Sequence, residues 1–322
     1  MMDSKALAEA WPSKTSSMTG EESQQGSPEQ PSGTPWALVA REAGLVFNVI
    51  RRDISSAVIP GLIFCVAAWN SSGQPLGALG PSLARSLLYF LLYSFTFCLS
   101  NQIVGVEEDR INKPDRPLAR GVVSIQGAWK RWFLAMGVYT FVGWWLGVLE
   151  WALLWQAVTV VHNVMRGARN WFIKNLSMGL GVLAALEAGW RMGAPMTENA
   201  WQWIVFLSVS VFVLVPLQDL RDIEGDRGNH RTTFPMAIGM TATRVFLGIG
   251  FAALAVITHV LLMQLAGTTG WVVWACDAAL GVVSLLIAWR VLALRTPQAD
   301  HTTYMLYTYW YCIALASAIV VL

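Results

Sequence analysis

The stretch NQIVGVEEDRINKPDRP, residues 101–117, follows a long apolar run that ends in FLLYSFTFCLS. It therefore lies where a membrane-spanning helix would leave the bilayer. Charged residues of both signs gather in it, namely Glu107, Glu108, Asp109, Arg110, Lys113 and Arg116. Basic residues alone would be enough to orient a chain in a membrane. The acidic residues indicate that this stretch has a further role.

The composition of the whole chain is that of a membrane protein. Of its 322 residues 55% are hydrophobic and 13% are charged, whereas soluble domains carry about 25% charged residues. The net charge of +2 gives no reason to expect a nucleic-acid partner. The four cysteines lie inside apolar runs without disulfide or zinc spacing, so we expect small buried hydrophobic residues at Cys65, Cys98, Cys276 and Cys312.

We predict an all-α integral membrane protein with nine transmembrane helices around a central intramembrane cavity. Residues 1–33 are rich in Ser, Gly, Gln, Glu and Pro and are expected to form a disordered cytoplasmic tail. Residues 34–53 are expected to form an amphipathic juxtamembrane helix, and residues 54–322 the transmembrane domain. The expected spans cover residues 54–72, 84–104, 130–148, 150–166, 172–192, 200–218, 241–264, 270–291 and 303–322.

The basic residues orient this arrangement. Nine spans place the N-terminus and the connections after even-numbered spans on one side. That side holds all of the 22 Lys and Arg residues except Arg85 and Arg191. Since positive charge marks the cytoplasmic face, we predict a cytoplasmic N-terminus and an active site that opens toward the cytoplasm.

The opening stretch has a second copy 117 residues further along the chain. QDLRDIEGDRGNHR, residues 218–231, shares the pattern E-x-D-R-x-N with it, at the end of the sixth span rather than the second. A separation of four spans indicates parallel repeats. In the second copy Asp219, Asp222 and Asp226 would align on one face of a helix that continues the sixth span. The first copy keeps Asp109 but has Gln102 and Gly105 at the other two positions.

Two acidic helix ends on the same side of the membrane predict a site for a hard cation. Mg²⁺ favours one or two carboxylates together with the phosphates of a substrate. The nearby bases would then bind a diphosphate that the metal bridges. The simpler alternative is a pair of solvated loops in which acids and bases pair locally. We predict metal ligands at Asn101, Glu108, Asp109, Asp219, Asp222 and Asp226.

These motifs resemble those of the UbiA superfamily of intramembrane prenyltransferases, which has nine helices and Asp-rich loops after the second and sixth. Its first motif, N-D-x-x-D-x-x-x-D followed by N-K-P-x-R-P, is matched except at Gln102 and Gly105. Its second motif is intact at Asp222 and Asp226. The resemblance gives catalytic roles to Asp109, Asp222 and Asp226. It also implies diphosphate binding by Arg116, Lys113, Lys174, Arg227 and Arg231.

The two replaced aspartates are similar to those of UbiA-type membrane terpene cyclases, and RRDISSAVIP at residues 51–60 also resembles that branch. The resemblance implies a Mg²⁺-dependent cyclase acting on a linear isoprenyl diphosphate of farnesyl length or longer. The alternatives are a prenyltransferase with an aromatic or lipid acceptor and, from another class, a cation transporter. Transporters bind ions near the bilayer midplane, often at inverted repeats, which these motifs do not match.

A few further residues within the expected spans are candidates for chemical roles. Asp277 is a candidate for shaping the cavity or accepting a terminating proton, and Glu187 for pairing with Arg191. His162 and His259 are expected to make hydrogen bonds in the core. Aromatic candidates for the cavity wall are Phe64, Trp69, Tyr93, Phe97, Tyr139, Trp203, Tyr307 and Tyr311.

Overall fold

The computed structural model describes residues 34–223, 231–264 and 267–322 and is built from helices. Throughout these residues there is no strand, and one bridge joins Asn170 to Thr232. The chain divides into a short unit that ends at Arg41 and a large unit, Glu42–Leu322. The all-α prediction is confirmed for this part of the chain.

The first half of the large unit is reached through α1, Pro35–Ile50, which begins in the short unit. The elements that follow are η1 (Ile54–Val58), α2 (Ile59–Ser71), α3 (Leu76–Val104), α4 (Val106–Asn112), α5 (Ile125–Trp145), α6 (Leu149–Thr159), η2 (Val160–Val164), η3 (Gly167–Arg169) and α7 (Trp171–Arg191). The second half contains α8 (Glu198–Leu214), η4 (Val215–Leu220), α10 (Phe234–Ile238), α11 (Met240–Thr258), η5 (His259–Gln264), α12 (Trp271–Ala293) and α13 (Pro297–Val321).

Side-chain caps set several of the helix starts. Ser124 accepts a hydrogen bond from the backbone N–H of Gly127 at the start of α5. Asn170 does the same for the first N–H groups of α7, and Thr197 and Thr296 cap α8 and α13. Each cap satisfies an N–H that has no partner inside its helix. Polar residues between the apolar runs therefore fix where the long helices begin.

Six helical stretches in the described ranges are long and apolar enough to cross a membrane. They are Ile54–Ser71, Leu76–Val104, Glu198–Leu220, Met240–Gln264, Trp271–Ala293 and Pro297–Val321. The spans expected at residues 130–148, 150–166 and 172–192 coincide with α5, α6 with η2, and α7, which are helical but do not meet that criterion.

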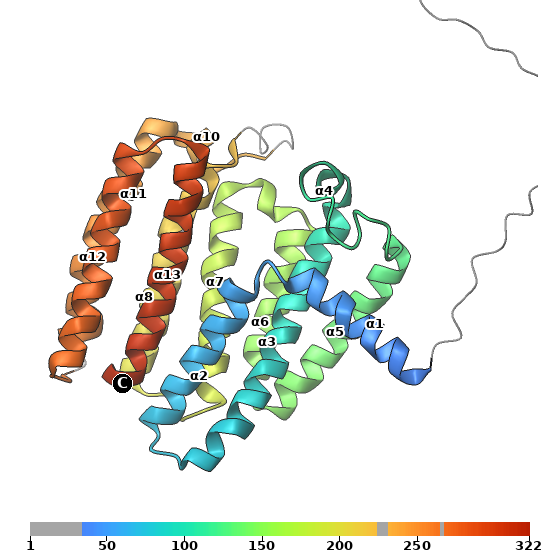
Figure 1. The fold of residues 1–322 in the computed structure, drawn as a ribbon, viewed down its shortest axis with the longest axis horizontal. Coiled ribbons are helices and arrows are strands. Elements are labelled where there is room, and N and C mark those ends of the chain that lie inside the picture. Colours follow the sequence, from blue (N-terminus) through green and yellow to red (C-terminus); the bar gives the residue numbers. More distant parts are fainter. Residues whose placement is uncertain (1–33, 224–230, 265–266) are drawn as a thin grey trace, which may run out of the picture. The chain divides into compact units, whose positions relative to one another are not determined.

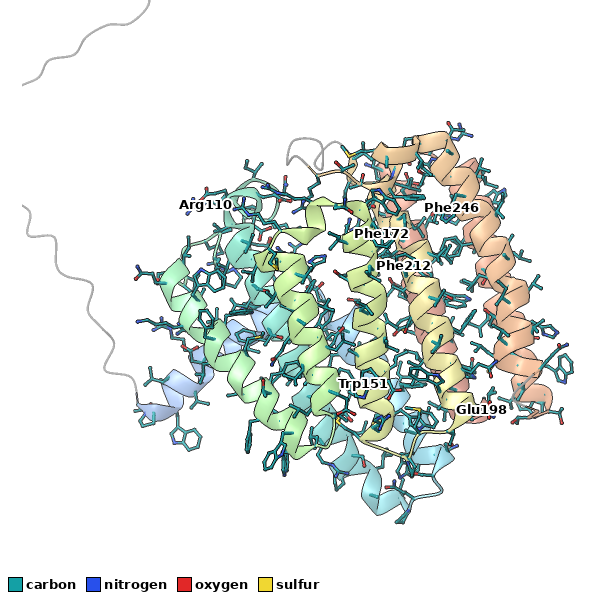
Figure 2. All side chains as sticks on the ribbon, turned by 180° about the vertical axis from the view of Figure 1, so that it is seen from behind. Arg110, Trp151, Phe172, Glu198, Phe212 and Phe246 are labelled. Atoms are coloured by element: carbon teal, nitrogen blue, oxygen red, sulfur yellow. The ribbon has the colours of Figure 1, made fainter. Side chains whose placement is uncertain are left out.

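The long helices form a series of contacts in which the last helix, α13, packs on α2 near the start of the series. Neighbours along the chain from α5 to α8 and from α11 to α13 contact one another, α3 packs on α5, and α13 returns to pack on α2. Figure 1 shows α11, α12 and α13 side by side, and α4 and α10 at one common end of the helices. In Figure 2 Arg110 of α4 lies at that end, while Trp151 and Glu198 lie at the opposite one.

Apolar side chains fill most of the space between these helices. One cluster joins α2, α7, α8 and α11 to α13, a second joins α3 to α6 and α7, and a third places the end of α1 against α3 and α5. The space that the side chains leave open among the helices, next to the α4 end, contains the candidate site.

Candidate active site

An apolar cavity of about 400 Å³ lies among the helices. Its lining comes from η1, α3, α6 with η2, α7, α8 with η4, and α13. Because both halves of the chain contribute to it, the cavity is central, as the sequence predicts.

One wall of this cavity is a series of aromatic rings. Trp155 stacks on Tyr93 with ring centroids 4.2 Å apart, and on Phe97 at 4.9 Å. Phe97 in turn contacts the ring of His162 at 5.0 Å. Hydrogen bonds lock the stack: Trp155 Nε1 donates to the carbonyl of Tyr93 at 2.9 Å, and Tyr93 Oη donates to the carbonyl of Gly181 at 3.0 Å. We call Tyr93, Trp155, Phe97 and His162 the ring wall.

A further part of the lining comes from α13. Tyr304, Tyr307 and Tyr311 recur at helical spacing and line the cavity, and the guanidinium of Arg221 lies 4.8 Å from the Tyr304 ring centroid. Four of the eight expected aromatics therefore line the cavity, namely Tyr93, Phe97, Tyr307 and Tyr311. Trp155 and Tyr304 were not predicted; helical spacing from Tyr307 and Tyr311 was the available signal for Tyr304.

A second, polar cavity of about 380 Å³ adjoins the first at the α4 end. The two share six lining residues: Asn101, Lys113, Arg116, His162, Ala168 and Arg231. The remaining charged residues of the polar cavity are Glu107, Glu108, Asp109, Arg166 and Arg169. The polar cavity thus has five basic and three acidic lining residues and is joined to the apolar cavity. That combination suits a ligand with an anionic head and an apolar body.

The acids of the opening stretch are held by bases. Both carboxylate oxygens of Asp109, which is 5% exposed, accept hydrogen bonds from Arg116 Nη1 at 2.9 and 2.7 Å. Arg231 donates to Glu108 at 2.8 Å and so joins the loop before α10 to α4. Glu107, which also lines the polar cavity, is exposed and pairs with Arg110 at 2.7 Å.

The bases at the junction also influence one another. Burial lowers the pKa of the Lys113 ammonium below its ordinary value of 10.5, and the charge of Arg116 lowers it further. Asp109 and Glu108 act in the opposite direction. Lys113 lies in the connection after α4 and lines both cavities, so its charge bears on whatever anion binds there.

The second acidic copy differs from the predicted stripe. The α-helix changes to a 3₁₀ helix at Val215 and ends at Leu220. Pro216 has no N–H to donate to the carbonyl four residues earlier, which explains the change. Consequently Asp219 is buried and pairs with Lys174, whereas Asp222 is exposed, pairs with Arg221 at 3.0 Å and lines the apolar cavity. Asp226 and Arg227 lie outside the described residues.

The two replaced positions of the first copy serve the fold. Gln102 is buried and donates from Nε2 to the carbonyl of Val49 at 3.0 Å, and it lines neither cavity. Gly105 separates α3 from α4, so no single helix continues through the motif. The amide of Gln102 fixes α3 to α1 at the place where the second copy has the charged pair of Asp219 with Lys174.

Asn101 connects the motif to η2. Its Nδ2 donates to Asn163 Oδ1 at 3.3 Å, and its side-chain Oδ1 makes no hydrogen bond within the described residues. Asp53, in the RRDISSAVIP stretch, also lines the apolar cavity and accepts a hydrogen bond from Cys98 Sγ at 3.3 Å. Sequence reasoning did not assign Asp53; its acidic side chain between two arginines and an apolar run was the available signal.

Asp277 does not take the role considered for it. It pairs with His259 at 2.6 Å and lines neither cavity, because α11 and α12 pack against each other at the edge of the helix assembly. Glu187 pairs with Arg191 at 2.8 Å, as expected from their spacing.

Comparison with known proteins shows the family of the chain. Residues 57–313 match the model of the UbiA prenyltransferase family. The chain is 42% identical to "Somaliensene A/B synthase" of Streptomyces somaliensis, over 89% of this chain and 95% of that protein. It is 37% identical to "Diterpene cyclase eriG" of Hericium erinaceus, over 87% and 89% of the two chains. It is 32% identical to "Polyprenyl transferase eriF" of the same organism, over 87% and 95%.

Solved structures share the fold at low identity. A structure described for digeranylgeranylglyceryl phosphate synthase superposes with a TM-score of 0.68 and 16% identity, covering 87% of this chain and 99% of that one. A UbiA homolog from Archaeoglobus fulgidus bound to GPP and Mg²⁺ gives a TM-score of 0.61 and 13% identity, covering 85% and 99%.

Proposed function

Because the chain belongs to the UbiA prenyltransferase family, we propose that it is a membrane-embedded terpene cyclase. It ionises a linear isoprenyl diphosphate, of farnesyl length or longer, and closes the carbocation onto a double bond of the same chain. The observation that carries this proposal is the pair of adjoining cavities, one basic and one walled by aromatic rings, with six lining residues in common. The relatives named as a terpene synthase and a diterpene cyclase support it.

In this reaction the allylic C–O bond breaks and its electron pair leaves with the diphosphate. Arg116, Lys113 and Arg231 surround the junction of the cavities and would bind the departing anion, with Lys174 beside them on the apolar cavity. Arg227 belongs to the same proposed set. Binding of the diphosphate requires Arg116 and Arg231 to exchange part of their pairing with Asp109 and Glu108 for phosphate oxygens.

The donor set fits Mg²⁺. Asn101, Glu108, Asp109 and Asp222 would hold it, and Asp219 and Asp226 complete the predicted set; all are oxygen donors. Within the described ranges no three His, Cys, Asp or Glu side chains are arranged to hold a metal ion by themselves. When bound, the metal supplies positive charge that stabilises the leaving diphosphate.

The ring wall suits the carbocation. Aromatic faces attract a cation by about 0.5–2 kcal/mol each, and Tyr93, Trp155 and Phe97 present such faces to one cavity. The carbocation needs a chamber that keeps bulk water away, because water would capture it, and the helices that surround this cavity would supply one.

Nine spans, a cytoplasmic N-terminus and a site that opens toward the cytoplasm remain part of this proposal. The apolar side chains that α5 exposes support a span there despite its lower hydropathy; they include Phe133, Leu134, Phe141 and Trp144. A bilayer around these surfaces would deliver the hydrocarbon chain by lateral diffusion. The tail at residues 1–33 and the juxtamembrane helix at 34–53 are proposed on composition alone.

The alternative is a prenyltransferase that moves the isoprenyl chain onto an aromatic or lipid acceptor. The relative named as a polyprenyl transferase, 32% identical, favours it. The two functions share ionisation and differ in what captures the cation. The cyclase needs no second substrate.

The test is incubation of purified full-length protein in detergent with Mg²⁺ and prenyl diphosphates of C10 to C25 length, without acceptor. We expect diphosphate release together with a cyclic terpene in the gas chromatogram. Turnover that appears only after addition of an aromatic or lipid acceptor would refute the cyclase and support the transferase.

A further inference from the structure

The cyclisation proposed above ends when the last carbocation loses a proton, and the apolar cavity contains few groups that can accept one. Its lysine and arginine side chains offer hydrogen-bond donors and no acceptor, and its phenols and thiol are very weak bases. Asp222 pairs with Arg221 and is a proposed metal ligand. Two possible acceptors remain among the described lining residues, Asp53 and His162.

The hydrogen bonds of Asn163 define the state of the His162 ring. Asn163 Nδ2 donates to the carbonyl of Phe97 at 3.0 Å and to Ser100 Oγ at 2.9 Å. A backbone carbonyl can only accept, so the orientation of the Asn163 amide is fixed. Its Oδ1 therefore faces His162 Nδ1, 2.8 Å away, and accepts the proton of that nitrogen. In the neutral ring Nε2 consequently carries the lone pair.

The lone pair of Nε2 is accessible. No hydrogen bond within the described residues uses Nε2, and this nitrogen is not among the fully buried polar atoms. The ring as a whole is 6% exposed and lines both cavities. Because the ring lines both cavities, a ligand held in them has access to the ring that carries this nitrogen.

The position of His162 links it to the cation. It is the last member of the ring wall, next to Phe97. Among the four rings of that wall, it alone also lines the polar cavity. A cation held over the ring faces meets a nitrogen base at the end of the same wall. Asp53 instead precedes η1 as its N-cap residue and accepts a hydrogen bond from the Cys98 thiol.

We propose, on the basis of the cyclase function, that His162 is the general base that terminates the reaction and that Asn163 positions it. The C–H bond next to the cationic carbon breaks, its electron pair forms the final C=C bond, and the proton binds Nε2. The imidazolium then passes this proton, through the polar cavity, to the released diphosphate or to water. The product is an olefin.

The experiment compares four variants of the full-length protein in detergent, measuring diphosphate release and product composition. His162→Phe keeps a ring beside Phe97 but has no nitrogen, and His162→Gln keeps a polar partner for Asn163 but is not a base. Asp53→Asn removes the competing acceptor. His259→Phe is the matched control, because this histidine also lies in an expected span but lines neither cavity.

We expect both His162 variants to continue releasing diphosphate while the share of the wild-type olefin falls by at least about tenfold. Alcohols or isomeric olefins should replace it, and His259→Phe should keep the wild-type composition. An unchanged composition in whichever His162 variant folds would overturn the proposal, as would an alcohol as the main wild-type product. A shift confined to Asp53→Asn would assign the role to Asp53. Absence of any acceptor-free cyclisation by the wild type would instead refute the proposed function.

Discussion

Gly181 on α7 gives the sharpest test of the ring wall. A Cβ added there would lie 2.4 Å from Cζ3 of Trp155 and 3.0 Å from Oη of Tyr93. Ordinary contacts of a Cβ begin at 3.4 Å, so Gly181→Ala requires the Trp155 ring to move by about 1 Å.

The surroundings resist that movement. Trp155 is stacked between Tyr93 and Phe97 and is tied by Nε1 to the Tyr93 carbonyl. Overpacking of this kind costs about 1–3 kcal/mol, and a misplaced ring wall changes which double bond meets the cation. We expect a lower Tm, a fall in turnover of about tenfold, corresponding to about 1.4 kcal/mol, and an altered product composition.

The assay is thermal unfolding of purified Gly181→Ala in detergent, followed by product analysis. Gly137→Ala on α5 and Gly281→Ala on α12 are matched controls, because a Cβ at either position meets no atom within 4 Å. Those two should be neutral or stabilising by up to about 1 kcal/mol. A Gly181→Ala protein with wild-type Tm and wild-type products would refute the description of the ring wall.

Three further predictions concern charge. Asp222→Ala, or treatment of the wild type with a chelator, should reduce diphosphate release by at least about a hundredfold while the protein stays folded. Added Mg²⁺ should restore diphosphate release only in the chelated wild type. Retained release would contradict the metal assignment. Burial lowers the pKa of Lys113, so its positive charge is lost at a lower pH than that of an ordinary lysine. KM for the diphosphate should therefore rise on the alkaline side already below pH 10.5, and Lys113→Arg should move this rise to higher pH. Identical pH profiles of KM for the two proteins would exclude Lys113 from the site. Asp300→Asn leaves the buried guanidinium of Arg244 without its bidentate carboxylate partner. The free energy of unfolding should fall by about 3–5 kcal/mol, while the folded fraction should make unchanged products. A wild-type Tm would show that this pair does not stabilise the fold.

Much of the architecture could be predicted from the sequence because it follows from local patterns. Apolar runs gave the long helices, and Ser124, Asn170 and Thr296 mark helix starts by residue type alone. The charged stretch that contains Arg116 lines both cavities, and its roles in metal and diphosphate binding stay predictions. These features depend on neighbours within a few residues.

The parts that sequence reasoning missed depend on contacts between distant segments. Asp109 and Glu108 are each held by an arginine, and whether an acid binds a metal or a base cannot be decided from its own spacing. Pro216 converts the predicted α-helical stripe into a 3₁₀ turn, which separates Asp219 from Asp222. Trp155 joins the cavity only because Gly181, 26 positions away, leaves room for its ring.

The central claim is that the cation is captured within its own chain. The most direct measurement is the stoichiometry of diphosphate release and cyclic terpene formation by the purified enzyme with Mg²⁺ and a single prenyl diphosphate, with no acceptor present. The cyclase predicts one cyclic terpene for each diphosphate released. Diphosphate release matched by linear prenyl alcohol, or no release until an acceptor is added, would contradict it.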